Sequence, residues 1–178
     1  MARPRTITDA RLLDALGQVI ASRGPGFTVA DVAAQAGVSV GTVAQRFGSK
    51  HGLLVALSEA AIAQIPDLVR SASTVLQALL NVYSGLDDPA TAPHNLAQLA
   101  ADLADPELRG LLGRFYSTLA DELTPLLIPL QGAPPQAARL LVALTNGTAV
   151  DWSINPVGRL ADRLTDDIGA VLNGWRTA

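Results

Sequence analysis

Apolar residues recur at every third or fourth position along most of the chain, which is the spacing of one face of an α-helix. The breaks in this spacing coincide with glycine, proline and short polar clusters, where helices usually end. The chain shows no alternating strand pattern, internal repeat or low-complexity tract. The pattern therefore predicts an all-α fold of about nine helices, near residues 8–22, 29–36, 39–46, 50–64, 75–86, 94–103, 105–125, 135–153 and 158–175.

The densest helix signals lie in the first third of the chain, where three helix starts and two tight turns fall within thirty residues. The hydroxyls of Thr28, Ser39 and Ser49 can each cap the exposed N–H groups at a helix start, and Asp31 completes a capping box with Thr28. Gly37 stands where the chain needs a left-handed turn. We therefore predict two short helices that cross at a sharp turn, as in a helix-turn-helix element.

The second short helix of this pair exposes a face of small and polar side chains that can enter a major groove. Thr42 suits a base edge or a thymine methyl, Gln45 can pair with adenine, and Arg46 can reach guanine or a phosphate. Gly41 lets the backbone approach closely, and Lys50 is predicted to point a cation at the DNA backbone. The predicted DNA-binding residues of this region are Thr28, Ser39, Val40, Gly41, Thr42, Gln45, Arg46 and Lys50.

This stretch resembles the amino-terminal signature of the TetR family of bacterial repressors, roughly T-V-x-x-V-A-x-x-A-G-V-S-x-G-T, then an aromatic, then F-x-S-K-x-x-L. The family usually has a phosphate-touching aromatic where this chain has Ala44, and Arg46 is expected to compensate with a charge-assisted phosphate contact. Outside such a signature, residues like Thr42, Gln45 and Lys50 would be solvated surface residues about as often as DNA-contacting ones. The matching residues are Thr28, Val29, Val32, Ala33, Ala36, Gly37, Val38, Ser39, Gly41, Thr42, Phe47, Ser49, Lys50 and Leu53.

The resemblance implies two domains. We expect a helix-turn-helix DNA-binding domain over residues 1–50 and a helical domain for effector binding and dimerisation over residues 51–178. In the family, the fourth helix links the two domains, and here Pro66 is expected to kink or end it near Gln64. The family's last two helices form a four-helix bundle with a twofold mate, although their apolar pattern alone would also fit a monomeric core.

The resemblance also implies an effector cavity within the second domain. A cavity with few polar anchors favours an apolar or aromatic ligand. Aromatic residues at helical spacing belong to a core more often than to a pocket, so a structural role competes with this interpretation. The candidate ligand-binding residues are Tyr83, Phe115, Tyr116, Asn146, Asp151 and Trp152.

Composition and charge fit a helical protein with a DNA-facing end. Apolar residues make up 49% of the chain and aromatic residues only 4%, so Leu, Ala and Val must build the core. Residues 1–55 hold six basic and three acidic residues, whereas the remainder holds seven basic and thirteen acidic. This asymmetry would orient the molecule toward a polyanion, within the limits of salt screening. The basic arm with Arg3 and Arg5 is expected either to be disordered or to contact DNA phosphates or a minor groove.

The sequence offers little catalytic or metal-binding chemistry. Because it has no cysteine, disulfides and thiolate metal sites are excluded. His51 and His94 lie on separate elements without metal-ligand spacing, and His51 is expected to face DNA or solvent. The aspartate pairs at 87–88 and 166–167 are expected to be solvated charges at helix ends. We therefore expect no enzyme activity, catalytic residue, metal or cofactor.

The main hypothesis is a dimeric transcriptional repressor that docks residues 39–46 of each protomer on a palindromic operator and is released by a small effector. A small-molecule-binding or protein-interaction module with weakened DNA binding is the alternative, motivated by Ala44 and the acidic second domain. An all-helical enzyme is a third hypothesis, which rests only on the expected cavity. The sequence shows neither a signal peptide nor an apolar run of about 20 residues, so we expect a cytoplasmic protein.

Overall fold

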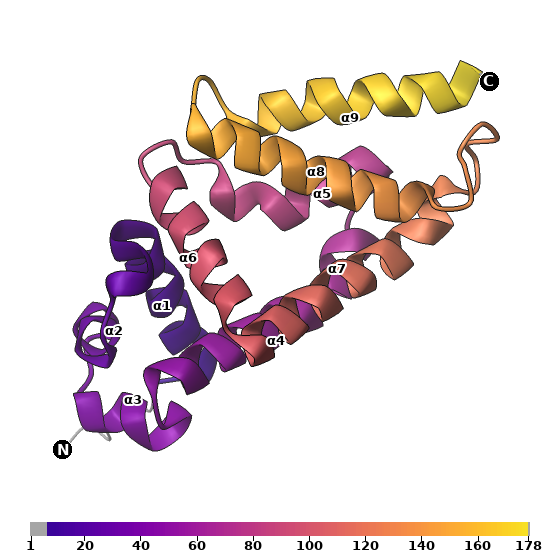
Figure 1. Ribbon diagram of the computed structural model, residues 1–178. Coiled ribbons are helices and arrows are strands. Elements are labelled where there is room, and N and C mark those ends of the chain that lie inside the picture. The colour runs from indigo at the N-terminus through magenta and orange to yellow at the C-terminus, as the bar shows by residue number, and fades with distance from the viewer. Residues whose placement is uncertain (1–6, 178) are drawn as a thin grey trace.

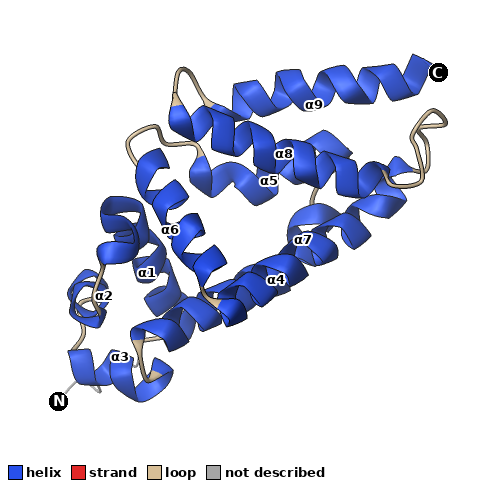
Figure 2. Ribbon diagram, in the orientation of Figure 1, coloured by secondary structure: helices blue, strands red, loops and turns tan. Residues whose placement is uncertain are grey.

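The computed structural model describes residues 7–177, so the predicted contacts of Arg3 and Arg5 lie outside the described residues. These described residues form nine α-helices and two short 3-10 helices, with no strand among them (Figure 1, Figure 2). The predicted all-α architecture is confirmed. The elements are α1 (Asp9–Arg23), η1 (Gly24–Gly26), α2 (Val29–Ala36), α3 (Val40–Phe47), α4 (Lys50–Arg70), α5 (Val75–Tyr83), η2 (Ser84–Leu86), α6 (Ala92–Ala104), α7 (Pro106–Leu127), α8 (Ala137–Ile154) and α9 (Leu160–Thr177).

The amino-terminal helices α1, α2 and α3 pack with the first two turns of α4 around one core, which we call the head (lower left in Figure 1). Phe27 fills the centre of this core from the turn before α2, and Leu53 enters it from α4. Burying such a side chain contributes about 1.5 to 3 kcal/mol. The buried members are Leu12, Leu16, Val19, Ile20, Phe27, Val32, Ala33, Val43 and Leu53.

Local capping fixes the helix starts of the head as the sequence predicts. The Thr28 hydroxyl accepts the Asp31 N–H at 3.3 Å, and the Asp31 carboxylate accepts the Thr28 N–H at 2.8 Å, which completes the capping box. The Thr28 hydroxyl also donates to the Asp31 carboxylate at 2.8 Å, and this hydrogen bond, together with the one from the Thr28 N–H, lowers the pKa of Asp31. Gly37 ends α2 in the left-handed region with φ +69° and ψ +36°, a conformation that favours glycine.

The remaining helices form a second core, which we call the body. Trp152 of α8 is fully buried there, and α8 and α9 run along the edge farthest from α3 (Figure 1). α6 lies between head and body, because it packs on α1 and η1 on one side and on α7 and α8 on the other. The position of α6 couples the two cores without a flexible linker.

α4 belongs to both cores. Its Leu53 is fully buried in the head and its Ile65 is fully buried in the body, while α7 packs along it. Among the described residues, α4 is also the helix that is long and apolar enough to cross a membrane by length and composition. Its buried residues are Leu53, Ile65 and Val69, which it supplies to the two cores.

Pro66 was expected to kink or end α4 near Gln64, and the second alternative is wrong, because the helix continues to Arg70. Proline removes one backbone donor and disfavours the preceding helical turn. Ile65 and Val69 flank it and are both buried in the body, so their packing outweighs the local loss. Pro125 is likewise inside α7, which ends only at Leu127.

The expectation of solvated aspartates is wrong for Asp87 and Asp167, whereas Asp88 and Asp166 are exposed. Asp87 accepts hydrogen bonds from Arg159 at 2.6 and 3.0 Å and from the Ala161 N–H at 3.3 Å, and its side chain is only 11% exposed. Asp167 accepts the Thr148 hydroxyl at 2.8 Å. Both carboxylates therefore fix α9 to the rest of the body.

Candidate nucleic-acid interface

α3 is a short helix with one anchored side and one exposed side. The Ser39 hydroxyl accepts the Thr42 N–H at 3.1 Å and caps its start, while Val43 is fully buried in the head core. The exposed face of α3 carries Val40, which is 48% exposed, together with Gly41, Ala44 and Gln45. This face lies at the end of the molecule opposite α9 (Figure 1).

Thr42 and Gln45 have different surroundings on this helix. Thr42 is half-buried, and its hydroxyl lies 2.9 Å from the Ser39 hydroxyl, so its free surface is chiefly the methyl group. Gln45 is exposed, and its amide can form the two parallel hydrogen bonds that adenine offers in the major groove. The geometry therefore allows both predicted base contacts.

Arg46 lies at the edge of α3 and is already paired. Its guanidinium donates to the Asp9 carboxylate of α1 at 2.7 Å, and 26% of its side chain is exposed. An exposed ion pair of this kind contributes about 0 to 1 kcal/mol, so a phosphate can compete for the guanidinium. Sequence analysis missed Asp9, because nothing local marks a partner 37 residues away.

Lys50 turns back toward the head and away from the solvent side of α4. Its ammonium donates to the Pro25 carbonyl and lies 4.3 Å from the centroid of the Phe27 ring. Such a cation–π contact contributes about 0.5 to 1 kcal/mol at an exposed site. Lys50 therefore holds η1 against α4, and a phosphate contact requires the side chain to change partners.

The turn between α3 and α4 depends on Gly52, which sequence analysis also missed. A Cβ added at this position would lie 2.0 Å from the backbone oxygen of Phe47. The same oxygen accepts the Ser49 N–H at 2.8 Å, and the Ser49 hydroxyl accepts the Gly52 N–H at 3.0 Å. Only glycine fits this approach, which sets how α4 leaves the helix-turn-helix pair.

The amino-terminal geometry agrees with a family comparison. Residues 12–57 match the family model described as bacterial regulatory proteins, tetR family. The amino-terminal part of the chain, over residues 12–57, therefore belongs to the TetR family. Its α2 and α3 are accordingly the helix-turn-helix pair of a DNA-binding transcriptional regulator. No curated protein matches the chain.

Solved structures of similar fold extend the comparison over the whole chain. A transcriptional regulator from Rhodococcus sp. Rha1 has a TM-score of 0.67 and 24% identity, over 94% of this chain and 97% of its own. A Rhodococcus sp. protein classed with the TetR-family transcriptional regulators has a TM-score of 0.69 and 25% identity, over 94% and 98%. The multidrug binding protein EbrR, complexed with malachite green, has a TM-score of 0.66 and 20% identity, over 97% and 98%.

His51 connects the TetR-family head to the body. It is exposed to solvent, as expected, and it also contacts the start of α7, because its Nε2 lies 2.9 Å from the Glu107 carboxylate and its Nδ1 lies 3.4 Å from the Asp105 carboxylate. Asp105 caps α7 by accepting the N–H groups of Glu107 and Leu108 at 2.9 and 3.0 Å. The Leu108 hydrogen bond is the main reason that the pKa of Asp105 is lowered.

Four of the six candidate effector residues form one group. The Tyr83 hydroxyl donates to the Asn146 side-chain oxygen at 2.6 Å, which links α5 to α8. Burial raises the pKa of Tyr83, with a further contribution from nearby Tyr116, so the phenol stays protonated. Phe115 and Tyr116 meet edge to face, with 5.8 Å between ring centroids. Phenol, amide and ring thus converge in the body.

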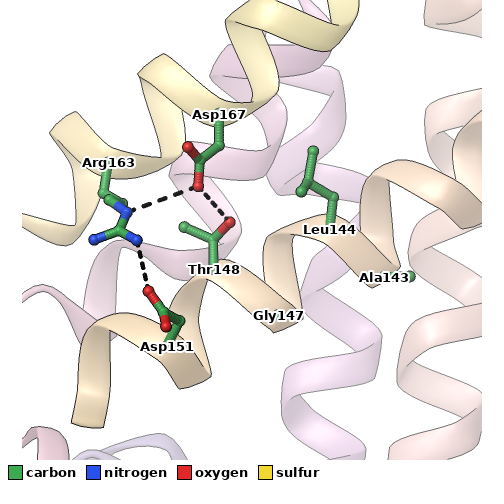
Figure 3. A pocket seen from close by; sticks show the side chains of 7 residues that line it. All are labelled: Ala143, Leu144, Gly147, Thr148, Asp151, Arg163 and Asp167. Atoms are coloured by element: carbon green, nitrogen blue, oxygen red, sulfur yellow. Dashed lines mark hydrogen bonds and ion pairs between the residues drawn. The ribbon is translucent and has the colours of Figure 1, made fainter. Parts of the chain in front are cut away.

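The structure does not bring Asp151 and Trp152 into this group. Trp152 is fully buried, and its indole N–H donates to the Gly158 carbonyl at 3.4 Å, which fixes the loop before α9. Asp151 is exposed on the outer side of α8 and pairs with Arg163 of α9 at 2.5 Å (Figure 3). These placements favour a structural role for Trp152 and a surface role for Asp151.

Proposed function

We propose that this protein is a dimeric repressor that docks α3 of each protomer into successive major grooves of a palindromic operator. The observation that carries the proposal is the exposed face of α3, held outward by buried Val43 and by the Ser39 cap. Half-sites should lie about 34 to 36 Å apart, or a multiple of that spacing, on one face of the duplex.

In this proposal, the side chains of α3 divide into base-reading and phosphate-contacting groups. Thr42 and Gln45 read base edges, while Val40 and Gly41 allow close approach to the groove. Backbone phosphates are contacted by polar and cationic side chains around the base-reading ones. The proposed phosphate contacts are Thr28, Ser39, Arg46 and Lys50, with Arg3 and Arg5 of the amino-terminal arm.

Dimerisation is proposed through α8 and α9. The outer side of α8 exposes small and apolar residues, including Ala143, Gly147, and Ile154, which is 72% exposed. Ala143 and Gly147 line an open hollow whose far wall is α9, where Arg163 lies between Asp151 and Asp167 (Figure 3). Small residues let a second copy approach closely, and the charged residues beside them would set its register.

The proposed effector is a small apolar or aromatic molecule bound in the body near Tyr83, Asn146, Phe115 and Tyr116. This group supplies three aromatic rings and one amide, and two of its three helices, α7 and α8, also contact α6. EbrR, a multidrug binding protein complexed with malachite green, supports an effector with aromatic rings. Asp151 and Trp152 complete the proposed set of six effector-binding residues, although their positions favour other roles.

A module with weakened DNA binding is the second candidate function. Ala44 provides no phosphate-reaching side chain on the exposed face of α3, and the cations of Arg46 and Lys50 are engaged by Asp9 and Pro25. Each engaged cation reduces the electrostatic attraction of the head for a polyanion. The two candidate functions differ in whether the protein recognises a specific operator sequence.

The proposed functional division follows residues 1–50 for DNA binding and residues 51–178 for effector binding and dimerisation, with α4 as the transmitting element. A small allosteric coupling of about 1 to 3 kcal/mol would change operator affinity about 5- to 150-fold. The family match over residues 12–57 supports the regulatory, non-enzymatic role in the cytoplasm that we propose.

Selection of bound DNA from a random pool tests the proposal, followed by gel-shift titration of the selected and random sequences. Thr42→Ala and Gln45→Ala should each weaken operator binding about 5- to 150-fold while leaving random-sequence binding nearly unchanged. Gln64→Ala, at an exposed glutamine of α4, is the matched control and should bind like the wild type. Failure to select any sequence, or equal losses on both DNAs, would contradict base reading by α3.

A further inference from the structure

We propose that His51, Asp105 and Glu107 form a proton-controlled latch that holds the head against α7 of the body. The three residues come from the first turn of α4 and from the start of α7. This inference goes beyond the proposed function, because it requires neither an operator nor an effector.

The latch depends on the two ring nitrogens of His51. Nε2 faces the Glu107 carboxylate at 2.9 Å, and Nδ1 faces the Asp105 carboxylate at 3.4 Å. A neutral imidazole has one N–H donor and one acceptor, whereas the imidazolium has two donors. The protonated ring can therefore hydrogen-bond Glu107 through Nε2 and attract Asp105 by its charge beside Nδ1, whereas a neutral ring must place one nitrogen lone pair against a carboxylate oxygen.

The latch lies where movement of the head would begin. Ser49 separates α3 from α4, so His51 follows the recognition helix by four residues, while Asp105 is the N-cap of α7. The side chains of His51, Asp105 and Glu107 are 44%, 35% and 64% exposed, which leaves them open to proton exchange with solvent. The latch thus responds to pH without opening either core.

The other charged groups around the latch do not replace it. On α7, Arg109 lies near Asp105 and donates to the Leu103 carbonyl at 3.1 Å, while Asp102 of α6 acts as a like charge on Asp105. On the head side, Lys50 is directed to the Pro25 carbonyl, and Arg46 to Asp9. Among the residues that the structure describes, the imidazolium is the cation that lies between Asp105 and Glu107.

A second contact between head and body serves as a reference. His94 of α6 places its Nδ1 2.9 Å from the Ala21 carbonyl of α1. A carbonyl only accepts, so both the neutral Nδ1–H tautomer and the imidazolium can make this hydrogen bond. The two histidines of the chain therefore differ in their partners, since His51 faces two carboxylates and His94 faces a carbonyl.

The sign of the pH effect follows from the environment of His51. The hydrogen bond to Glu107 raises the pKa of His51 above its ordinary value of 6.5, helped by the charges of Asp105 and Glu107 and opposed by desolvation. Stabilisation of the docked head is therefore complete below about pH 6.5 and is lost as pH rises through the raised pKa. Alkaline conditions loosen the head, and acidic conditions fix it.

The absence of cysteine allows a direct distance measurement in the full-length chain. Spin labels would be attached at Ala34→Cys on α2 and Ser117→Cys on α7, both exposed positions, with unlabelled protein in excess to suppress distances between protomers. Pulsed EPR would give the head-to-body distance distribution from about pH 5.5 to about pH 8.5, and NMR would titrate the His51 and His94 rings.

We expect a narrow distribution at low pH and a second, displaced population at high pH, with a midpoint that follows the His51 titration. The ratio of docked to displaced heads should change about 2- to 5-fold, the range for an exposed ion pair. His51→Gln and Glu107→Gln should abolish this pH response, whereas Asp121→Asn, at an exposed carboxylate of α7, should retain it. Circular dichroism would confirm that every variant is folded.

A distance distribution that does not change with pH would overturn the latch, as would a full pH response in folded His51→Gln. Neither result depends on DNA, so the latch can fail while the repressor proposal stands. Likewise, failure to find an operator would leave the distance measurement unaffected.

Discussion

Lys50 serves the fold of the head in the absence of DNA. Its ammonium satisfies the Pro25 carbonyl and covers the Phe27 ring, so it joins η1 to α4 across 25 residues. A cation at a helix start is also well placed for a phosphate. The Pro25 carbonyl and a DNA phosphate would therefore compete for the same ammonium group.

Lys50→Ala should reveal both roles. Loss of the ammonium should lower the free energy of unfolding by about 1 kcal/mol and the Tm by about 2 to 4 °C. If the side chain also contacts a phosphate, the salt dependence of DNA binding should become shallower by about one ion. Thermal unfolding and salt-dependent gel shifts measure the two effects, and Arg11→Ala, at an exposed cation of α1, is the control. An unchanged salt slope would remove Lys50 from the phosphate contacts.

Long-range partners of single side chains were beyond sequence analysis. Lys50, Arg46 and His51 find their partners 25, 37 and 56 residues away. The sequence identified Arg46 and Lys50 as cations near a helix-turn-helix, but it held no signal for Asp9, Pro25 or Glu107. Such pairs arise only when the helices are packed, because each partner has an ordinary local sequence.

At the scale of elements, the helix starts were predictable because their causes are local. Thr28, Ser39 and Ser49 each cap the helix that follows, with partners three residues away. The continuation of α4 through Pro66 was not predictable, because it depends on the burial of Ile65 and Val69 against other helices. Local rules fail where tertiary packing outweighs them.

Gly52 provides a sharp test of how α4 is positioned. Gly52→Ala should destabilise the head by about 1 to 3 kcal/mol, since the new methyl group would meet the Phe47 oxygen at 2.0 Å and force the backbone to move. Gly17→Ala in α1 is the matched control, because a Cβ there meets nothing within 4 Å.

The control should stabilise α1 by up to about 1 kcal/mol through helix propensity. Chemical denaturation would measure both variants. Equal stabilisation by the two alanines would show that the turn between α3 and α4 does not need glycine.

At the scale of the molecule, the recognition helix and the proposed dimer face lie at opposite ends (Figure 1). The family resemblance predicted this division, and the match over residues 12–57 confirms the family of the amino-terminal part. The sequence could not predict how α6 fills the space between head and body, since that packing joins four elements.

Gly147 tests the proposed dimer face. Gly147→Glu should shift the protein toward the monomer, because a charged side chain would be buried beside Asp151 and Asp167. Gly113→Glu in α7 is the matched control, since both glycines are exposed and a Cβ at either meets nothing within 4 Å. Sedimentation velocity would measure the change. A Gly147→Glu protein that remains dimeric would place the interface elsewhere.

The sharing of α4 between two cores limits how this protein can be cut or recombined. A fragment ending at Lys50 would lose Leu53, a fully buried side chain of the head, together with the partly buried Leu54 and Leu57. It would expose the underside of α1 and α2 to water and so be prone to aggregate. A chimaera that joins this head to another body must therefore include the chain through Leu57. The helix that continues α4 in such a chimaera must keep these leucines packed in the head core.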